Sequence, residues 1–130
     1  MKIKIITIEK FDEFKEFFDN ETLDYIIINI SASWCKPCNE IKEELNEFIN
    51  NVEINSNLNA VFLRIDYDLL EEDQDFQKYF QPNKIPYFYI YKNKILITEF
   101  QSANIETIKN NVTSEFLKNN NNIFDLTCDF

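Results

Sequence analysis

The chain has 130 residues, 45% of them hydrophobic and 15% aromatic, and a formal net charge of −10 at pH 7. This length suits one domain with a full hydrophobic core, and the negative charge disfavours nucleic acid and anionic membranes as partners. The sequence contains neither glycine nor histidine. It therefore lacks the glycine-rich loops that bind nucleotide phosphates, Ser-His-Asp and Cys-His catalysis, and histidine-ligated zinc. Its chemistry must come from cysteine, carboxylates, lysine or tyrosine.

The first part of the sequence predicts a strand, a helix and a second strand. Residues 2–8 alternate charged and apolar side chains before a short apolar run, which predicts an outer strand. Residues 9–20 place phenylalanines at helical spacing, and we expect these to fill the core. Residues 24–30 form a near-continuous apolar run, typical of a strand buried on both faces. The phenylalanines of the predicted helix are Phe11, Phe14, Phe17 and Phe18.

A long helix is expected to begin at Pro37, because proline is favoured in the first turn of a helix. One stripe of this helix is apolar, and its glutamates lie largely on the opposite, solvated face. Residues 59–66 predict the next strand, and residues 69–80 predict a further helix. The apolar stripe consists of Ile41, Leu45, Phe48, Ile49 and Val52.

The remaining elements are a hairpin and a final helix. Residues 87–91 and 95–100 flank a tight turn at residues 92–94, which predicts two antiparallel strands. Residues 104–118 predict the last helix. The resulting order, β-α-β-α-β-α-β-β-α, implies an α/β layered sandwich with a central mixed sheet.

Residues 1–118 are expected to form one domain, and residues 119–130 an asparagine-rich C-terminal tail. Cys128 in this tail is interpreted as a free thiol, the alternative being a regulatory or intermolecular disulfide. Three cysteines do not make the pattern of a secreted disulfide framework. The N-terminal apolar run is too short for a signal peptide, and no stretch approaches the length of a transmembrane helix. We therefore expect a soluble, monomeric, cytoplasmic protein.

The segment Ser33–Cys38 contains two cysteines where the buried strand is followed by the long helix. The free N–H groups and the dipole at a helix N-terminus favour a thiolate at Cys35. Cys38 lies in the first helical turn, so its sulfur can reach that of Cys35. This placement indicates redox chemistry; the alternatives are half of a metal site or two inert thiols. A zinc site is poorly supported, because structural zinc takes four N or S ligands and only Cys128 remains.

In these features the chain resembles the thioredoxin family. The similarity covers residues 1 to about 118 and implies the thioredoxin fold. Pro86 lies about where the family places its cis-proline. The matching residues are Ala32, the Trp-Cys-x-Pro-Cys run Trp34–Cys38, Ile65-Asp66 at the end of the third predicted strand, and Ile85-Pro86 before the fourth.

The resemblance implies a thiol-disulfide oxidoreductase that reduces protein disulfides and takes part in electron transport and cell redox homeostasis. Cys35 would be the exposed nucleophile that attacks a partner disulfide, and Cys38 would resolve the mixed disulfide. It implies no cofactor or metal, and regeneration by a thioredoxin reductase or by glutathione. The structural alternatives are a packing role for Trp34 and a trans peptide bond before Pro86. The expected substrate groove consists of Trp34, Lys36, Pro37, Ile85, Pro86 in cis, and Tyr87.

Several residues differ from the family pattern. Asn29 stands where thioredoxins usually bury an aspartate. Because an amide cannot take the proton of Cys38, the attack of Cys38 on the mixed disulfide should be slower or should use water as the proton acceptor. Lys36 replaces the usual glycine and either favours the Cys35 thiolate, making the reduction potential less reducing, or is simply solvated. Lys94 and Gln101 also stand at usual glycine positions. These differences, with Tyr87 for the usual threonine, leave a second hypothesis: a binding or assembly module with weak redox activity.

Overall fold

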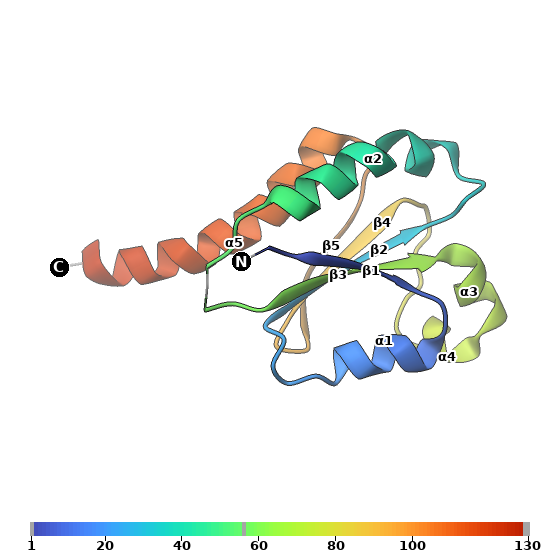
Figure 1. Cartoon of the computed structure of the whole chain (residues 1–130), viewed down its shortest axis with the longest axis horizontal. Helices are drawn as coiled ribbons and strands as arrows, with labels where there is room; N and C mark the ends of the chain where they lie inside the picture. The colour runs from blue at the N-terminus through green and yellow to red at the C-terminus, as the bar shows by residue number, and fades with distance from the viewer. Residues whose placement is uncertain (1, 56, 129–130) are drawn as a thin grey trace.

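The computed structural model describes the backbone of residues 2–55 and 57–128, and side chains as far as residue 116. A five-stranded mixed sheet lies between two layers of helices (Figure 1). The strands are β1 (Lys4–Ile8), β2 (Tyr25–Ser31), β3 (Ala60–Asp66), β4 (Tyr87–Lys92) and β5 (Ile95–Gln101). The helices are α1 (Phe11–Phe18), α2 (Lys36–Asn51), α3 (Tyr67–Glu72), α4 (Gln74–Gln77) and α5 (Ile105–Cys128).

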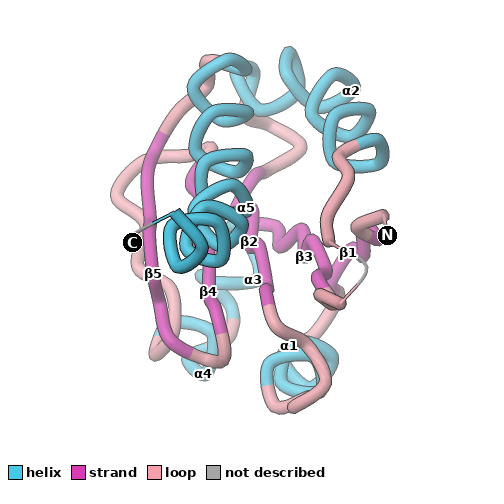
Figure 2. The backbone as a smooth tube through the Cα atoms, turned by 90° about the vertical axis from the view of Figure 1, so that its left-hand side faces the viewer, coloured by secondary structure: helices cyan, strands magenta, loops and turns pink. Residues whose placement is uncertain are grey.

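The sheet has the strand order β1-β3-β2-β4-β5. Strands β1 and β2 both pair with β3 in parallel, whereas β4 is antiparallel to β2 and to β5. Helices α2 and α5 cover one face of this sheet, and α1 and α4 lie on the other (Figure 2). The predicted α/β sandwich with a mixed sheet is therefore confirmed.

Strand β2 is the central strand, and every residue from Tyr25 to Ile30 is buried. Alternate side chains point to opposite faces, so Ile26, Ile28 and Ile30 belong to the core under α1, while Tyr25 and Ile27 belong to the core under α2 and α5. This explains why the sequence of the strand is apolar without alternation. Asn29 is its buried polar exception.

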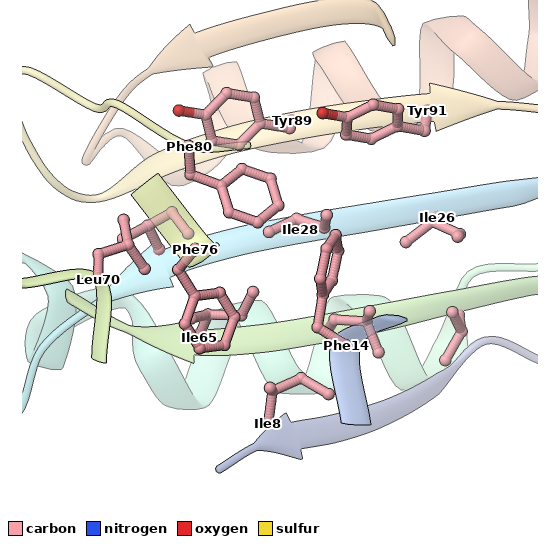
Figure 3. Packing of buried hydrophobic residues seen from close by; sticks show 13 residues of the cluster. Ile8, Phe14, Ile26, Ile28, Ile65, Leu70, Phe76, Phe80, Tyr89 and Tyr91 are labelled. Atoms are coloured by element: carbon pink, nitrogen blue, oxygen red, sulfur yellow. The ribbon is translucent and has the colours of Figure 1, made fainter. Parts of the chain in front are cut away.

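The core under α1 is built around Phe14 (Figure 3). Its ring centroid lies 5.1 Å from that of Tyr79 and 5.2 Å from that of Phe80, both in edge-on arrangements. The other three phenylalanines of the predicted helix, Phe11, Phe17 and Phe18, are partly buried against the same cluster. The interpretation of these residues as core residues is confirmed.

The helix predicted over residues 69–80 is divided into α3 and α4, and this part of the prediction is wrong. Asp73 has an extended backbone (φ −125°, ψ 111°) and ends α3. Its carboxylate accepts the N–H of Asp75 at 2.9 Å and so caps the start of α4. The apolar residues of both segments, including Phe76, nevertheless reach the core under α1.

Helix α5 continues to Cys128, ten residues beyond the predicted end at Lys118. Neither proline nor glycine interrupts the asparagine run, so nothing in the backbone chemistry stops the helix there. Its last turns extend past the sheet (Figure 1). The division into a domain and a tail stays a prediction, and the side chain of Cys128 lies outside the described residues.

Within residues 2–55 and 57–128, no helix has the length and apolar character needed to cross a membrane.

The predicted hairpin between β4 and β5 is confirmed, with Lys92 opposite Ile95. The two turn residues, Asn93 (φ 50°) and Lys94 (φ 68°), both have left-handed backbones. A two-residue turn of this kind requires positive φ at both positions, and glycine usually meets that requirement. Here asparagine and lysine meet it instead.

Candidate active site

The two cysteines lie where the loop that follows β2 joins α2. Cys35 is the N-cap of α2, and its sulfur accepts the backbone N–H of Cys38 at 3.3 Å. Pro37 lies in the first turn, where a missing N–H removes no helical hydrogen bond. The Cα atoms of Cys35 and Cys38 are 5.3 Å apart, and their sulfurs form a disulfide. The prediction that the second sulfur can reach the first is confirmed.

In this disulfide form both cysteines are buried, with 6% of Cys35 and 5% of Cys38 exposed. They pack together with Ala32 and against the partly buried side chains of Tyr67 and Ile85. The expectation of an exposed Cys35 is therefore wrong for this form. The reason is that Tyr67 of α3 and Ile85 of the loop before β4 pack against the cysteines and cover them.

Trp34 lies at the surface beside the cysteines, with 61% of its area exposed. Its indole N–H donates to the Asp68 carboxylate at 3.0 Å, and its ring meets that of Tyr67 edge-on at 6.2 Å. Trp34 is therefore not a buried core residue. Together with Tyr67 and four loop residues, Trp34 lines a shallow pocket of about 190 Å³ next to the disulfide. The four loop residues are Pro82, Asn83, Lys84 and Ile85.

The loop before β4 brings Ile85 and Pro86 to the cysteines. The Ile85–Pro86 peptide bond is cis, so the trans alternative is wrong. Ile85 contacts the cysteine cluster, and Pro86 shares a cavity with Cys38. Tyr87 points elsewhere: its hydroxyl donates to Glu99 at 2.7 Å, which raises the pKa of Tyr87, and its ring packs against Tyr89.

Lys36 is strongly exposed, with 88% of its side chain accessible. Its ammonium lies 3.9 Å from the Glu40 carboxylate, one turn along α2. Exposed charges of this kind are screened by solvent and interact weakly. The geometry favours the interpretation of Lys36 as solvated surface.

Behind the disulfide, a cavity of about 180 Å³ lies between α2 and the carboxyl ends of the strands. Its lining includes Cys38, Asn29 and Arg64. Asn29 is 2% exposed, as predicted for a buried position near the cysteines, and its Oδ1 accepts the Nε–H of Arg64 at 3.3 Å. Arg64 was not among the site residues predicted from the sequence. The available signal was that this arginine, the only one in the sequence, interrupts an otherwise apolar predicted strand.

The described residues include no group of three or more His, Cys, Asp or Glu side chains placed to hold a metal ion. The reactive groups that the fold brings together here are the sulfurs of Cys35 and Cys38. A dithiol at the N-terminus of the helix after a central strand, facing a cis-proline, defines a thiol-disulfide oxidoreductase site on a mixed α/β sheet.

Comparison with known proteins agrees with this class. The thioredoxin family model matches residues 4–114, and the chain belongs to the thioredoxin family. The thioredoxin fold and the thiol-disulfide oxidoreductase activity implied by the resemblance are confirmed.

Two relatives are thioredoxins from a snake and a fish. Thioredoxin of Ophiophagus hannah is 30% identical over 97 residues, which cover 75% of this chain and 85% of the relative. Thioredoxin of Ictalurus punctatus is 27% identical over 108 residues, which cover 83% and 95%.

Solved structures show the same fold. Thioredoxin of Schistosoma mansoni superposes with a TM-score of 0.68 at 20% identity, covering 85% of this chain and 94% of the other. Thioredoxin f2 in a complex with ferredoxin:thioredoxin reductase superposes with a TM-score of 0.69 at 18% identity, with the same coverage of both chains.

Proposed function

We propose that this protein reduces disulfide bonds in other proteins, with Cys35 as the nucleophile and Cys38 as the resolving cysteine. The observation that carries the proposal is the position of Cys35 as the N-cap of α2, with its sulfur accepting the N–H of Cys38. In the reduced protein the same N–H and the helix N-terminus favour a thiolate at Cys35. Cys38 instead lines the cavity behind the disulfide, which suits a residue that reacts second.

The exchange proceeds through a mixed disulfide. The Cys35 thiolate attacks one sulfur of the substrate disulfide, a bond forms between them, and the substrate disulfide breaks. The departing substrate sulfur takes a proton from water. Cys38 then loses its proton and attacks the Cys35 sulfur, which restores the Cys35–Cys38 disulfide and releases the second substrate thiol. The substrate gains two electrons, and the dithiol loses them.

We propose that an extended segment of the substrate binds in the pocket beside the disulfide. Trp34 and Ile85 offer apolar area there, and the Trp34–Asp68 hydrogen bond holds the indole in place. The proposed substrate contacts are Trp34, Lys36, Pro37, Ile85, Pro86 and Tyr87. Tyr87 would first have to leave its bond to Glu99.

The oxidised protein needs a reductant after each cycle, and we propose a thioredoxin reductase or glutathione in this role. The structural neighbour solved with ferredoxin:thioredoxin reductase supports a reductase as partner. A dithiol that donates electrons requires a reducing compartment, so the cytoplasm is the proposed location. The protein is proposed to act there as a monomer.

A disulfide-reduction assay with dithiothreitol tests the proposal. Cys35→Ser should abolish turnover of a protein disulfide, whereas Cys128→Ser should leave it unchanged. Equal turnover by wild type and Cys35→Ser would refute the proposed role of Cys35.

A trapping experiment separates this function from a binding module. Cys38→Ser cannot resolve the mixed disulfide, so it should accumulate covalent adducts with substrate proteins that dithiothreitol releases. Stable partners without any covalent adduct would favour the binding-module hypothesis instead.

A further inference from the structure

The cavity behind the disulfide is lined by a partly buried cationic group, Arg64, that the exchange described above does not use. Arg64 lies on β3 in register with Asn29 on β2, so both side chains point toward the face covered by α2. The guanidinium carbon lies 5.3 Å from the centre of the Phe62 ring. Nη2 of Arg64 is buried and has no hydrogen-bond partner among the described residues. Burial lowers the pKa of Arg64, yet arginine remains protonated in proteins.

Asn29 cannot accept the proton of Cys38. Its Oδ1 is occupied by the Nε–H of Arg64, and its Nδ2 lies 3.4 Å from the carbonyl oxygen of Tyr87. An amide also has no proton-accepting form at neutral pH. Among the described residues, the cavity lining includes Cys38 but not Cys35. The cavity therefore brings the charge of Arg64 to the side of the disulfide where Cys38 lies.

We propose that Arg64 is a positioning residue for the second step of the exchange: its guanidinium stabilises the thiolate of Cys38, and the proton of Cys38 passes to water in the cavity. This inference rests on the proposed function. The Cys38 thiolate forms a bond to the Cys35 sulfur while the bond from Cys35 to the substrate sulfur breaks. The bonding electrons leave with the substrate sulfur, which is protonated by water.

Water can take part because the cavity is large and reaches the surface. Its volume of about 180 Å³ is many times the roughly 10–15 Å³ that one water requires. Exposed residues, including Ser33, Asn39 and Lys42, lie on its lining. Water that enters there can accept the proton, so the step needs no carboxylate at position 29.

Two other charged side chains line the cavity. Lys42 on α2 is exposed, so solvent screens it. Asp66 at the end of β3 is the competing proton acceptor, but its carboxylate accepts the N–H of Asp68 at 2.8 Å and caps α3. Strands β1 and β2 and the loop before β4 contribute Thr7, Asn29, Ser31 and Pro86, which carry no charge. Tyr67 of α3 packs against the cysteines and carries a phenol.

The two steps can be measured separately with an aromatic disulfide whose released thiolate is coloured. In a Cys128→Ser chain, the reduced protein should release one equivalent when Cys35 attacks and a second when Cys38 resolves the adduct. Cys38→Ser identifies the second phase by losing it. Arg64→Met removes the charge but keeps an unbranched, largely apolar side chain beside Phe62. Arg64→Lys keeps the charge, and Asp66→Asn keeps the helix cap while removing the carboxylate.

Arg64→Met should move the pH midpoint of the second phase upward by about one unit and slow that phase about tenfold near neutral pH, since a nearby opposite charge favours an ionised group by this order. The first phase should stay unchanged. Arg64→Lys should stay within about threefold of the unsubstituted chain, as expected when charge rather than shape is required. Asp66→Asn should change neither phase. Arg64→Gln provides a second neutral variant if Arg64→Met does not fold.

Three results would overturn the inference. If the neutral Arg64 variants kept the pH midpoint and rate of the second phase, the arginine would be only structural. If Asp66→Asn alone abolished the second phase, the proton acceptor would be that carboxylate. If the unsubstituted dithiol showed no second phase at all, the proposed function would fail together with this inference.

Discussion

The β4–β5 turn allows a stability prediction that follows from the absence of glycine. Lys94 adopts φ 68°, a conformation in which the Cβ atom crowds the backbone. The left-handed conformation costs a non-glycine residue about 1–2 kcal/mol, and glycine is free of this cost. Glycine loses more backbone entropy on folding, which offsets about 0.5–1 kcal/mol of the gain. Lys94→Gly should therefore stabilise the protein by about 0.5–1 kcal/mol.

Urea unfolding at equilibrium measures this difference directly, and the slope of the transition should not change. Lys94→Ala is the matched control, because alanine removes the lysine side chain but keeps the Cβ atom. It should give no comparable gain. If Lys94→Gly were no more stable than Lys94→Ala, backbone conformation at the turn would not be the source of the effect, and the reasoning would be refuted.

Two further predictions concern the core and the tyrosines. Phe14→Ala should lower the free energy of unfolding by about 3–5 kcal/mol, because Phe14 is fully buried among aromatic rings. Phe17 is only partly buried, so Phe17→Ala should lower it by less than half as much. Similar losses for the two variants in urea unfolding would contradict this. The contribution of three buried tyrosines to stability should be constant between neutral pH and about pH 10, and stability should fall at higher pH. The reason is that burial raises the pKa of Tyr25, Tyr89 and Tyr91 above 10.0 in the folded state, so these tyrosines ionise more readily in the unfolded chain. A free energy of unfolding that does not change as the pH rises above 10 would contradict this prediction.

Local patterns predicted most of the elements. The apolar run of β2, the phenylalanine spacing of α1 and the proline at the start of α2 each act over a few residues. Their errors were also local in origin. The extended backbone of Asp73 divided a continuous apolar pattern into α3 and α4, and the asparagine run in α5 lacked the proline or glycine that ends a helix.

The candidate site was predicted in part. The spacing of Cys35 and Cys38 at a helix N-terminus was sufficient to indicate a redox pair, since both residues lie within one turn. The burial of Cys35 could not be predicted in this way, because Tyr67 and Ile85, which pack against it, are far from it in the sequence. The hydrogen bond from Trp34 to Asp68 likewise joins two segments that only the folded chain brings together.

The sequence by itself thus determined the type of chemistry: two cysteines in one helical turn, no histidine, and an amide at position 29. Only the tertiary structure decided what surrounds that chemistry. The parallel pairing of β2 with β3 sets Arg64 against Asn29, and the packing of α2 over those strands places Cys38 on the same cavity. Strand register and helix packing bring these residues together from different elements, so no local pattern could have shown that Cys38 and Arg64 line the same cavity.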